Sequence, residues 1–406
     1  MGSADVRIFP FSRNPLHEAS TIIVGIDATR NRSGGAVAHL RGVLGVVDPV
    51  PYGISQVHLW AYDELLQAIN SQPWLIKHPV AATHGSILQQ LTWQYFRLPS
   101  IAKQLGVGVM FNTDAGSVCP FQPSVTLSQD MLSFEPGEMQ RFPWPGRARL
   151  RLEVLKRVQL HSLQKSSTAL FLTEHARQVI GQVGSLPKSV VVPHGIDQRF
   201  FEASAARRPW PTVGPIRCLY VSNAALYKHQ WHVVAAISQL RSKTGIDLRL
   251  RLVGGGQGPA MDRLTLAVAE YDPEGKFVEL ERFIPNTAIA TELTRADLFI
   301  YASSCENLPV TLLEAMAAGL PIASSNRGPM PEVLGDAATF FDPENPGAIA
   351  AAVFSIINDQ ALRERIRADA QHRARAFTWN HCADLTWQVL FDSATNMSTS
   401  SNPHHG

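Results

Sequence analysis

Short apolar runs alternate with helical patterns along most of this chain. The first run, residues 21–27, is rich in β-branched residues, and Gly34 and Gly35 precede a helical pattern that begins at about Ala36. Similar runs predict further strands at residues 56–61, 107–111, 124–127, 169–172 and 190–192. Strands that alternate with helices are typical of parallel sheets with helices on both faces.

A second series of strand and helix patterns follows a segment rich in proline and glycine. This segment, residues 203–215, contains many breakers of regular structure and is predicted to be a linker. Further strands are predicted at residues 217–221, 248–253, 277–280, 298–302 and 321–323. The pattern therefore predicts an α/β protein with two Rossmann-like domains, residues 21–202 and 216–377, and a last helix at 378–395. Residues 1–20 and 396–406 are expected to be irregular or disordered.

Composition supports a globular protein and gives no sign of nucleic-acid binding. Hydrophobic residues make up 45% of the 406 positions, charged residues 17%, and the formal net charge is +2. The four cysteines form no Cys-x-x-Cys pair, which favours reduced thiols in a cytosolic enzyme. The first twenty residues lack the apolar core of a signal peptide, and no apolar run reaches transmembrane length. A cytoplasmic location is expected.

The most informative motif is a pair of glutamates, Glu306 and Glu314, separated by seven residues. An apolar strand pattern precedes Glu306, and a run of helix formers leads through Glu314 to Gly319. Glu306 is therefore predicted in a loop at the carboxyl end of a strand, with Glu314 about two turns into the next helix. Open α/β sheets bind ligands at this edge, and the amino end of a helix suits a diphosphate.

This motif resembles the retaining nucleotide-sugar glycosyltransferases of family 4, whose fold is called GT-B. The spacing, Pro309 and the Glu-Ala-Met-Ala-Ala-Gly-Leu-Pro sequence carry the resemblance. It implies that Glu306 contacts the donor sugar and Glu314 the nucleotide ribose. It also implies an acceptor-side first domain, a donor-side second domain, and a last helix that crosses back to the first. The donor is expected to contact the residues between the glutamates as well, namely Asn307, Leu308, Pro309 and Val310.

The loop after the first strand of the second domain carries further donor candidates. Lys228 matches the family's lysine on the donor diphosphate and is assigned a catalytic role. Asn223 stands where the family has an arginine, and a neutral amide cannot offset diphosphate charge as a guanidinium does. Ser222, beside it, is also assigned to the donor. The glycine run at 254–258 is explained at least as well by a tight turn as by ligand contact.

The remaining candidates lie on other strand ends. The resemblance implies that Ile284 helps to frame the nucleobase and that Gly34 and Gly35 let the backbone approach the donor phosphates. On the acceptor side it points to His84 and Asp130. Asp130 is assigned a catalytic and acceptor-binding role, with a simple turn cap as the alternative. Family members often have a histidine where this chain has Gln129. His194 is interpreted as a structural residue near the hinge.

The chain contains no Asp-x-Asp and no His/Cys cluster with zinc spacing, so no metal or other cofactor is expected. The predicted function is a retaining transfer of a hexose-type sugar to a saccharide or lipid-linked saccharide, in cell-surface polysaccharide synthesis. Two alternatives remain open: a non-catalytic nucleotide-sugar-binding scaffold, and a hydrolase or epimerase of the same fold.

Residues 141–165 form a basic segment with seven arginines and lysines, one glutamate, and apolar residues at helical spacing. Trp144 stands near its start. The pattern is interpreted as an amphipathic helix that places the enzyme on the inner face of an anionic membrane. An ordinary surface helix with one core face explains the same pattern.

Overall fold

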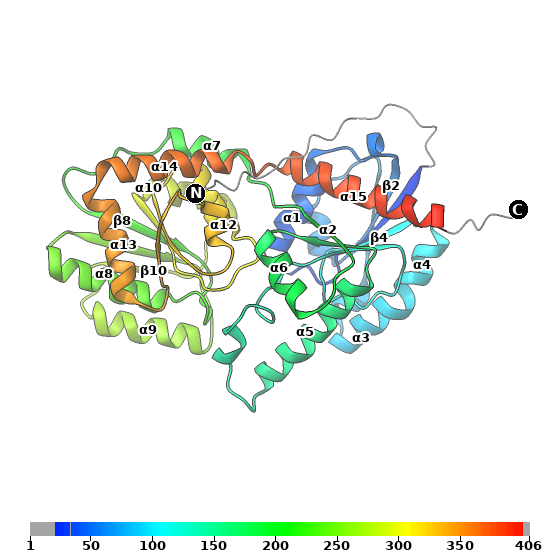
Figure 1. Ribbon diagram of the computed structural model, residues 1–406, viewed down its shortest axis with the longest axis horizontal. Helices are drawn as coiled ribbons and strands as arrows, with labels where there is room; N and C mark the ends of the chain where they lie inside the picture. The colour runs from blue at the N-terminus through cyan, green and yellow to red at the C-terminus, as the bar shows by residue number, and fades with distance from the viewer. Residues whose placement is uncertain (1–20, 33, 401–406) are drawn as a thin grey trace, which may run out of the picture.

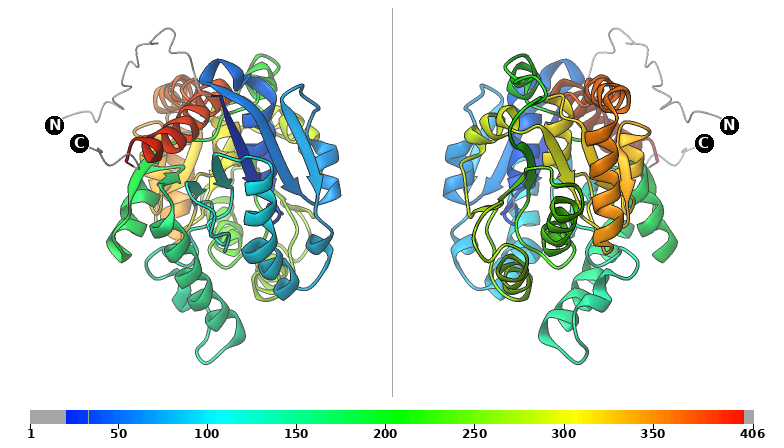
Figure 2. Two further views of the ribbon diagram at one scale, coloured as in Figure 1. Left: turned by 90° about the vertical axis from the view of Figure 1, so that its right-hand side faces the viewer. Right: turned by 90° about the vertical axis from the view of Figure 1, so that its left-hand side faces the viewer.

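Two α/β domains lie side by side in the computed structural model, which describes residues 21–32 and 34–400 (Figure 1). The expected irregular segment 1–20 and residues 401–406 of the expected tail lie outside the described residues. Each domain contains a sheet whose paired strands are all parallel. Helices surround both sheets (Figure 2), so the expected fold class is confirmed.

The N-terminal domain is built on a seven-stranded sheet with the order β3-β2-β1-β4-β5-β6-β7. Its strands are β1 (Ile22–Asp27), β2 (Ile54–Ala61), β3 (Leu75–Pro79), β4 (Val109–Asn112), β5 (Ser124–Leu127), β6 (Thr168–Phe171) and β7 (Lys188–Val191). Its longer helices are α1 (Gly34–Val46), α2 (Asp63–Ala68), α3 (Ile87–Thr92), α4 (Leu98–Gln104), α5 (Arg147–Lys165) and α6 (Glu174–Val183). Short helical turns are η1 (Val50–Tyr52), η2 (Ala81–His84), η3 (Trp93–Arg97) and η4 (Glu138–Arg141).

The C-terminal domain is built on a six-stranded sheet with the order β10-β9-β8-β11-β12-β13. Its strands are β8 (Ile216–Val221), β9 (Leu248–Val253), β10 (Val278–Glu281), β11 (Leu298–Tyr301), β12 (Ile322–Ser325) and β13 (Thr339–Phe341). Its helices are α7 (Gln198–Ala205), α8 (Gln230–Thr244), α9 (Pro259–Tyr271), α10 (Asn286–Arg295), α11 (Val310–Ala317), α12 (Met330–Leu334), α13 (Pro346–Asn358) and α14 (Gln360–Ala374). Helix α7 packs against α10 and α11 (Figure 1).

The strand order fixes where a ligand can enter each sheet. The chain winds outward in one direction from β1 to β3 and in the other from β4 to β7, and it does the same on either side of β8 and β11. At such a switch point the loops leave the sheet in opposite directions and open a crevice beyond the carboxyl ends of the strands. The loops after β1, β8 and β11 therefore hold the positions from which a ligand is contacted.

The last helix, α15 (Trp379–Ser400), packs on the N-terminal domain (Figure 1). Glycine permits this contact, because a Cβ on Gly42 of α1 would lie 2.1 Å from the Trp379 ring. Trp387 is fully buried with its ring in an edge contact with Trp74. Tyr52 donates a hydrogen bond of 2.6 Å to Asp384. The helix thus ties the end of the chain to the first domain.

Sequence patterns missed two strands and misplaced some boundaries. Strands β3 and β13 lie at the outer edges of their sheets and are partly exposed, so they lack a clear apolar run. Helix α1 begins at Gly34 rather than at Ala36, and α7 extends to Ala205 inside the predicted linker. Helix α15 continues to Ser400, so residues 396–400 of the expected disordered tail are helical. Each described helix is either too short or too polar to cross a lipid bilayer.

Candidate active site

Lys228 and Glu306 meet between the carboxyl ends of β8 and β11. Lys228 Nζ forms an ion pair with Glu306 Oε1, and the Tyr301 hydroxyl donates to the same oxygen at 2.7 Å. The Lys228 and Glu306 side chains are only 12% and 15% exposed. Burial raises the pKa of the Tyr301 hydroxyl well above its usual value, with the Glu306 charge adding to the effect, so the hydroxyl remains a donor. The group therefore presents one partly buried, fixed carboxylate and one cation.

Helix α11 begins four residues after Glu306, with Pro309 at its N-cap. Glu314 is the fifth residue of this helix, so it lies little more than one turn in, not the two turns expected. Its side chain is buried, and burial raises the pKa of its carboxyl from 4.5 to about 8, opposed by the Arg199 charge. Among the described residues, its carboxylate has no hydrogen-bond or ion-pair partner. Glu314 is therefore a buried acid whose hydrogen bonds remain to be made.

The amino ends of α1 and α11 approach each other from the two domains. A Cβ built on Gly35 would lie 4.0 Å from Val310 Cγ2, and one built on Gly34 would meet nothing within 4 Å. The first N–H groups of each helix have no intrahelical acceptor and carry the positive end of the helix dipole. Glycine keeps the α1 backbone accessible here. The two helix starts thus lie close together and leave N–H groups available to an anion.

The predicted donor loops pack tightly through their glycines. Gly254 has φ 125°, and a Cβ on it would lie 2.3 Å from the Ser222 carbonyl oxygen. The glycine run therefore has the packing role that a tight turn predicts. The Ser222 hydroxyl donates to the Asn223 carbonyl at 3.0 Å, while Asn223 is exposed. Ile284 is partly buried against the domain core, and its neighbour Phe283, not singled out by sequence, is 79% exposed.

Asn307 joins the Glu306 loop to the N-terminal domain. Its side-chain amide donates to the Ser128 carbonyl at 2.9 Å, and its own carbonyl accepts from the Thr173 hydroxyl at 3.1 Å. Asn307 was predicted to bind the donor, and these contacts give its side chain an interdomain role. The position of Glu306 therefore depends on how the domains are arranged.

A charged network also crosses between the domains, beside the same loop. Arg141 of the N-terminal domain bridges Glu138 at 2.7 Å and Glu344 of the C-terminal domain at 2.7 Å. Hydrogen bonds from Arg141 hold the pKa of the Glu344 carboxyl at about 2. Ser304 donates to Glu138 at 2.7 Å and contacts His229 Nε2 at 2.9 Å. Burial lowers the pKa of His229 to about 3, so this histidine is neutral and its Nε2–H is the donor to Ser304.

The acceptor-side candidates are less closely gathered. Asp130 Oδ1 accepts from the Leu132 backbone N–H at 2.9 Å, which is the turn cap considered as the alternative. His84 is about half exposed, with Nε2 3.4 Å from Asp63 Oδ2. No described contact joins His84 to Lys228 or Glu306. His194 is buried at the hinge with Nδ1 3.0 Å from that of His39, in keeping with a structural role.

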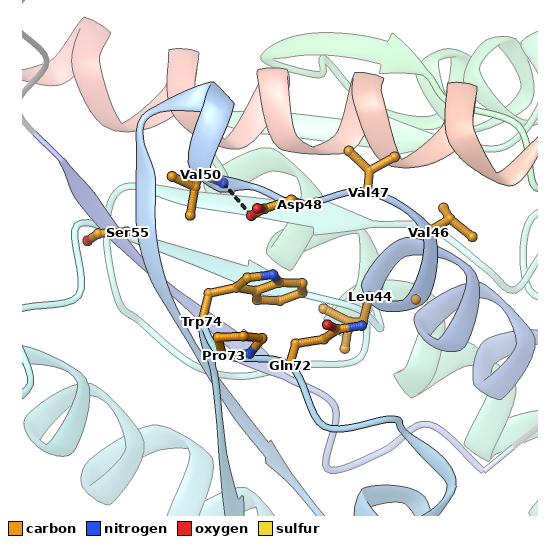
Figure 3. A pocket seen from close by; sticks show the side chains of 10 residues that line it. Leu44, Val46, Val47, Asp48, Val50, Ser55, Gln72, Pro73 and Trp74 are labelled. Atoms are coloured by element: carbon orange, nitrogen blue, oxygen red, sulfur yellow. Dashed lines mark hydrogen bonds between the residues drawn. The ribbon is translucent and has the colours of Figure 1, made fainter.

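A separate cavity of about 450 Å³ lies at the opposite edge of the first sheet (Figure 3). Its walls come from the end of α1 at Leu44, from Val50, and from Trp74 just before β3. These residues lie toward the amino ends of β2 and β3, whereas Gly34, Lys228 and Glu306 follow the carboxyl ends of strands. This cavity is therefore not part of the candidate active site.

Comparisons with known proteins agree with a functional site at the Lys228–Glu306 pair. Residues 205–373 match the family model for glycosyl transferases group 1. The O-antigen chain mannosyltransferase B of Escherichia coli is 30% identical over 135 residues, covering 33% of this chain and 35% of that protein. The chain spans about a third to a half of the length of the first curated relatives that it matches. The family match thus covers the domain that contains Lys228, Glu306 and Glu314.

Solved structures extend the likeness to both domains. A sucrose-phosphate synthase from Thermosynechococcus elongatus superposes with a TM-score of 0.74 at 16% identity, covering 94% of this chain and all of that one. The Anabaena protein HepE in complex with UDP-glucose superposes with a TM-score of 0.67 at 16% identity, covering 93% of this chain and 100% of that one. The chain has the GT-B fold.

Proposed function

We propose that this protein is a retaining glycosyltransferase that moves a hexose-type sugar from a nucleotide sugar to a saccharide or lipid-linked saccharide acceptor. The observation that carries the proposal is the Lys228–Glu306 pair at a switch point, where the Glu306 loop leads into α11 and the start of α11 lies beside the start of α1. The family match over the C-terminal domain supports it. A mannosyltransferase among the relatives and UDP-glucose in a protein of the same fold favour a hexose donor.

In the proposed reaction, the donor diphosphate lies between Lys228 and the amino ends of α1 and α11. The bond between the anomeric carbon and the diphosphate oxygen breaks, and the acceptor hydroxyl oxygen bonds to the same face of that carbon. The hydroxyl proton passes to the departing diphosphate. Glu306 accepts hydrogen bonds from sugar hydroxyls and Glu314 from ribose hydroxyls. Lys228 and the helix N–H groups offset the diphosphate charge, so we propose that the reaction needs no metal.

The acceptor is proposed to approach from the N-terminal domain, where the second oxygen of Asp130 is not used by the turn cap. His84 stands near the end of β3, on the same edge of the sheet.

The exposed surface of helix α5 bears on the chemistry of the acceptor. Helix α5 projects from the body of the protein with its amino end outward (Figures 1 and 2), and Trp144 and Leu150 there are 68% and 54% exposed.

The basic segment 141–165 has fewer unpaired cations than its sequence implied. Arg141 is held in the interdomain network, and Arg149 forms an ion pair of 3.1 Å with Glu153. Arg147, Arg151 and Arg157 remain exposed on α5. We propose that these three arginines, with Trp144 and Leu150, rest on an anionic membrane surface and bring the site to a lipid-linked acceptor in a cell-surface polysaccharide pathway.

Thermal stabilisation by a panel of nucleotide sugars, followed by assay of nucleoside diphosphate release with saccharide acceptors, tests this function. One donor should raise the melting temperature and support glycoside formation with retained anomeric configuration. Stabilisation without turnover in the presence of acceptors would favour a binding scaffold, which the departures at Asn223 and Gln129 motivate. Altered free nucleotide sugar without transfer would favour a hydrolase or epimerase. Failure of all donors to stabilise the protein would refute the proposal.

A further inference from the structure

A cavity of about 590 Å³ lined by arginines lies in the C-terminal domain, away from the candidate active site. Five arginines line it, against two glutamates: Arg208, Arg217, Arg249, Arg251 and Arg295. Its walls are the amino-terminal halves of β8 and β9, the carboxyl end of α10, and the segment between α7 and β8. The donor residues follow the carboxyl ends of the same strands. The arginine cavity and the donor site are therefore different sites.

Strand register places like charges side by side in this cavity. Arg217 of β8 is the direct register partner of Arg249 of β9, so both side chains leave the same face of the sheet. Like charges directly opposite each other on neighbouring strands destabilise a sheet. Both residues are exposed, so solvent reduces the repulsion without removing its cause. Two arginines therefore lie side by side on this face of the sheet, and only Arg249 has an acidic partner, Asp247 at 3.2 Å, among the described residues.

Acidic groups satisfy some of the arginines but not all of them. Arg251 pairs with Glu292 at 2.7 Å and Glu279 at 3.2 Å. Arg249 pairs with Asp247 at 3.2 Å, and Arg208 pairs with Asp297. These pairs fix the three guanidinium groups in place. In the described part of the chain, Arg217 and Arg295 have no ion-pair partner. The cavity thus combines fixed arginines with two exposed ones whose charges are not offset.

We propose that this cavity binds a small phosphorylated molecule through Arg217 and Arg295, with Arg249 beside them. A guanidinium group matches a phosphoryl group with two parallel hydrogen bonds, and the volume lies in the range of small-molecule sites. The same anion would offset the charge of Arg217, because Asp247 already pairs with Arg249. Because Arg208 lies in the segment between α7 and β8, the ligand would contact this segment as well as the sheet.

Calorimetric titration with inorganic pyrophosphate tests the proposal on the full chain. The variant R217Q/R295Q should weaken binding at this site by about tenfold or more, since charge-assisted hydrogen bonds are lost. The control R41Q/R375Q removes two exposed arginines elsewhere and gives the same net charge. It should bind as the wild type does. K228Q should retain the site, because Lys228 belongs to the donor site.

Three outcomes would overturn the proposal. Pyrophosphate binding that is lost in K228Q but kept in R217Q/R295Q would place the anion in the donor site. A weak, non-saturable response equal in all four proteins would show a general effect of ionic strength. A hexose 6-phosphate that binds no better than the hexose itself would exclude the phosphorylated class of ligand. Donor turnover is measured separately, so failure here leaves the proposed transferase function standing.

Discussion

Lys228 and Glu306 form a partly buried ion pair that links the ends of β8 and β11. The pair neutralises each group while the donor is absent. A diphosphate would attract Lys228 away from Glu306, which frees the carboxylate to accept hydrogen bonds from the sugar. The two residues are therefore expected to respond differently to substitution.

We predict that E306Q lowers turnover by about tenfold to a hundredfold, since a hydrogen bond to a charged group contributes roughly 1.5–3 kcal/mol. Binding of the nucleoside diphosphate should persist, because Lys228 no longer has a competing partner. K228Q should weaken that binding as well as turnover. Calorimetry with the nucleoside diphosphate and an initial-rate assay separate the two effects. Equal losses of binding in both variants would contradict the division of roles.

Glu314 should give folding stability a characteristic pH dependence. Burial raises the pKa of its carboxyl from 4.5 to about 8, so the folded protein holds a proton that the unfolded chain releases above pH 4.5. The contribution of the protonated Glu314 carboxyl to the free energy of unfolding is complete below pH 4.5 and is lost as the pH rises from 4.5 through 8. Relative to E314Q, the wild type should lose roughly 2–4 kcal/mol of unfolding free energy between pH 5 and pH 8. Urea denaturation at several pH values measures the difference, and parallel curves would refute the prediction.

Nucleotide binding should also release a proton from Glu314. Ribose hydroxyls donate hydrogen bonds to the ionised carboxylate and so favour it, which lowers its pKa in the complex. At pH 7 the wild type should release up to about one proton on binding the nucleoside diphosphate, and E314Q should release fewer. Calorimetry in two buffers with different ionisation enthalpies gives the number. Equal release by both proteins would mean that Glu314 does not contact the ribose.

The sequence predicts those features of the structure that depend on the order of strands and helices. It does not predict contacts between residues that are distant along the chain. Lys228, Glu306 and Glu314 could be placed because parallel strands bring their carboxyl ends to one edge, whatever the details of packing. Tyr301 was missed because an aromatic residue in a buried strand gives no sign that its hydroxyl faces a carboxylate. The partners of Asn307, Ser128 and Thr173, lie in the other domain. No pattern along the chain identifies such pairs.

The partners of charged residues are equally hard to predict from the sequence. Arg141 reads as one more cation of a basic helix, and only the domain arrangement places it between Glu138 and Glu344. The register of Arg217 with Arg249 likewise depends on which strands are neighbours. Edge strand β3, with Lys77 and His78 in its centre, shows too little apolar character to be recognised. The sequence thus predicts the fold class and the edge of the sheet that is proposed to bind the donor. It does not predict which residues pair across domains or across strands.

We predict that a few interdomain contacts hold the two domains together in the ligand-free protein. Glu332 of α12 accepts hydrogen bonds from the backbone N–H groups of Glu174 and His175 at 2.8 and 2.7 Å, at the amino end of α6. R141Q together with E332Q should open the domains and increase the radius of gyration in X-ray scattering. The control R365Q removes a surface pair within α14 and should leave it unchanged. An unchanged radius in both variants would show that other contacts set the arrangement.

Metal dependence distinguishes two ways of stabilising the departing diphosphate. If Lys228 and the helix amino ends supply the positive charge, an excess of chelator should change the transfer rate by less than about twofold. The measurement is an initial rate with and without chelator, at a saturating donor concentration. Loss of activity that manganese restores would refute the metal-independent mechanism while leaving the fold unaffected.

The membrane surface proposed on α5 is tested with vesicles. Arg147, Arg151 and Arg157 are exposed there, beside Trp144 and Leu150, and each basic side chain near an anionic bilayer contributes about 1 kcal/mol. The wild type should sediment with phosphatidylglycerol vesicles at low salt and less so at high salt, because salt screens the attraction. R147E/R151E/R157E should not sediment, yet should glycosylate a short soluble acceptor at the wild-type rate. R149E is a control at a paired arginine, since Arg149 is paired with Glu153, and it should retain most of the binding. If the wild type stays in solution at low salt, α5 is an ordinary surface helix with one face in the core.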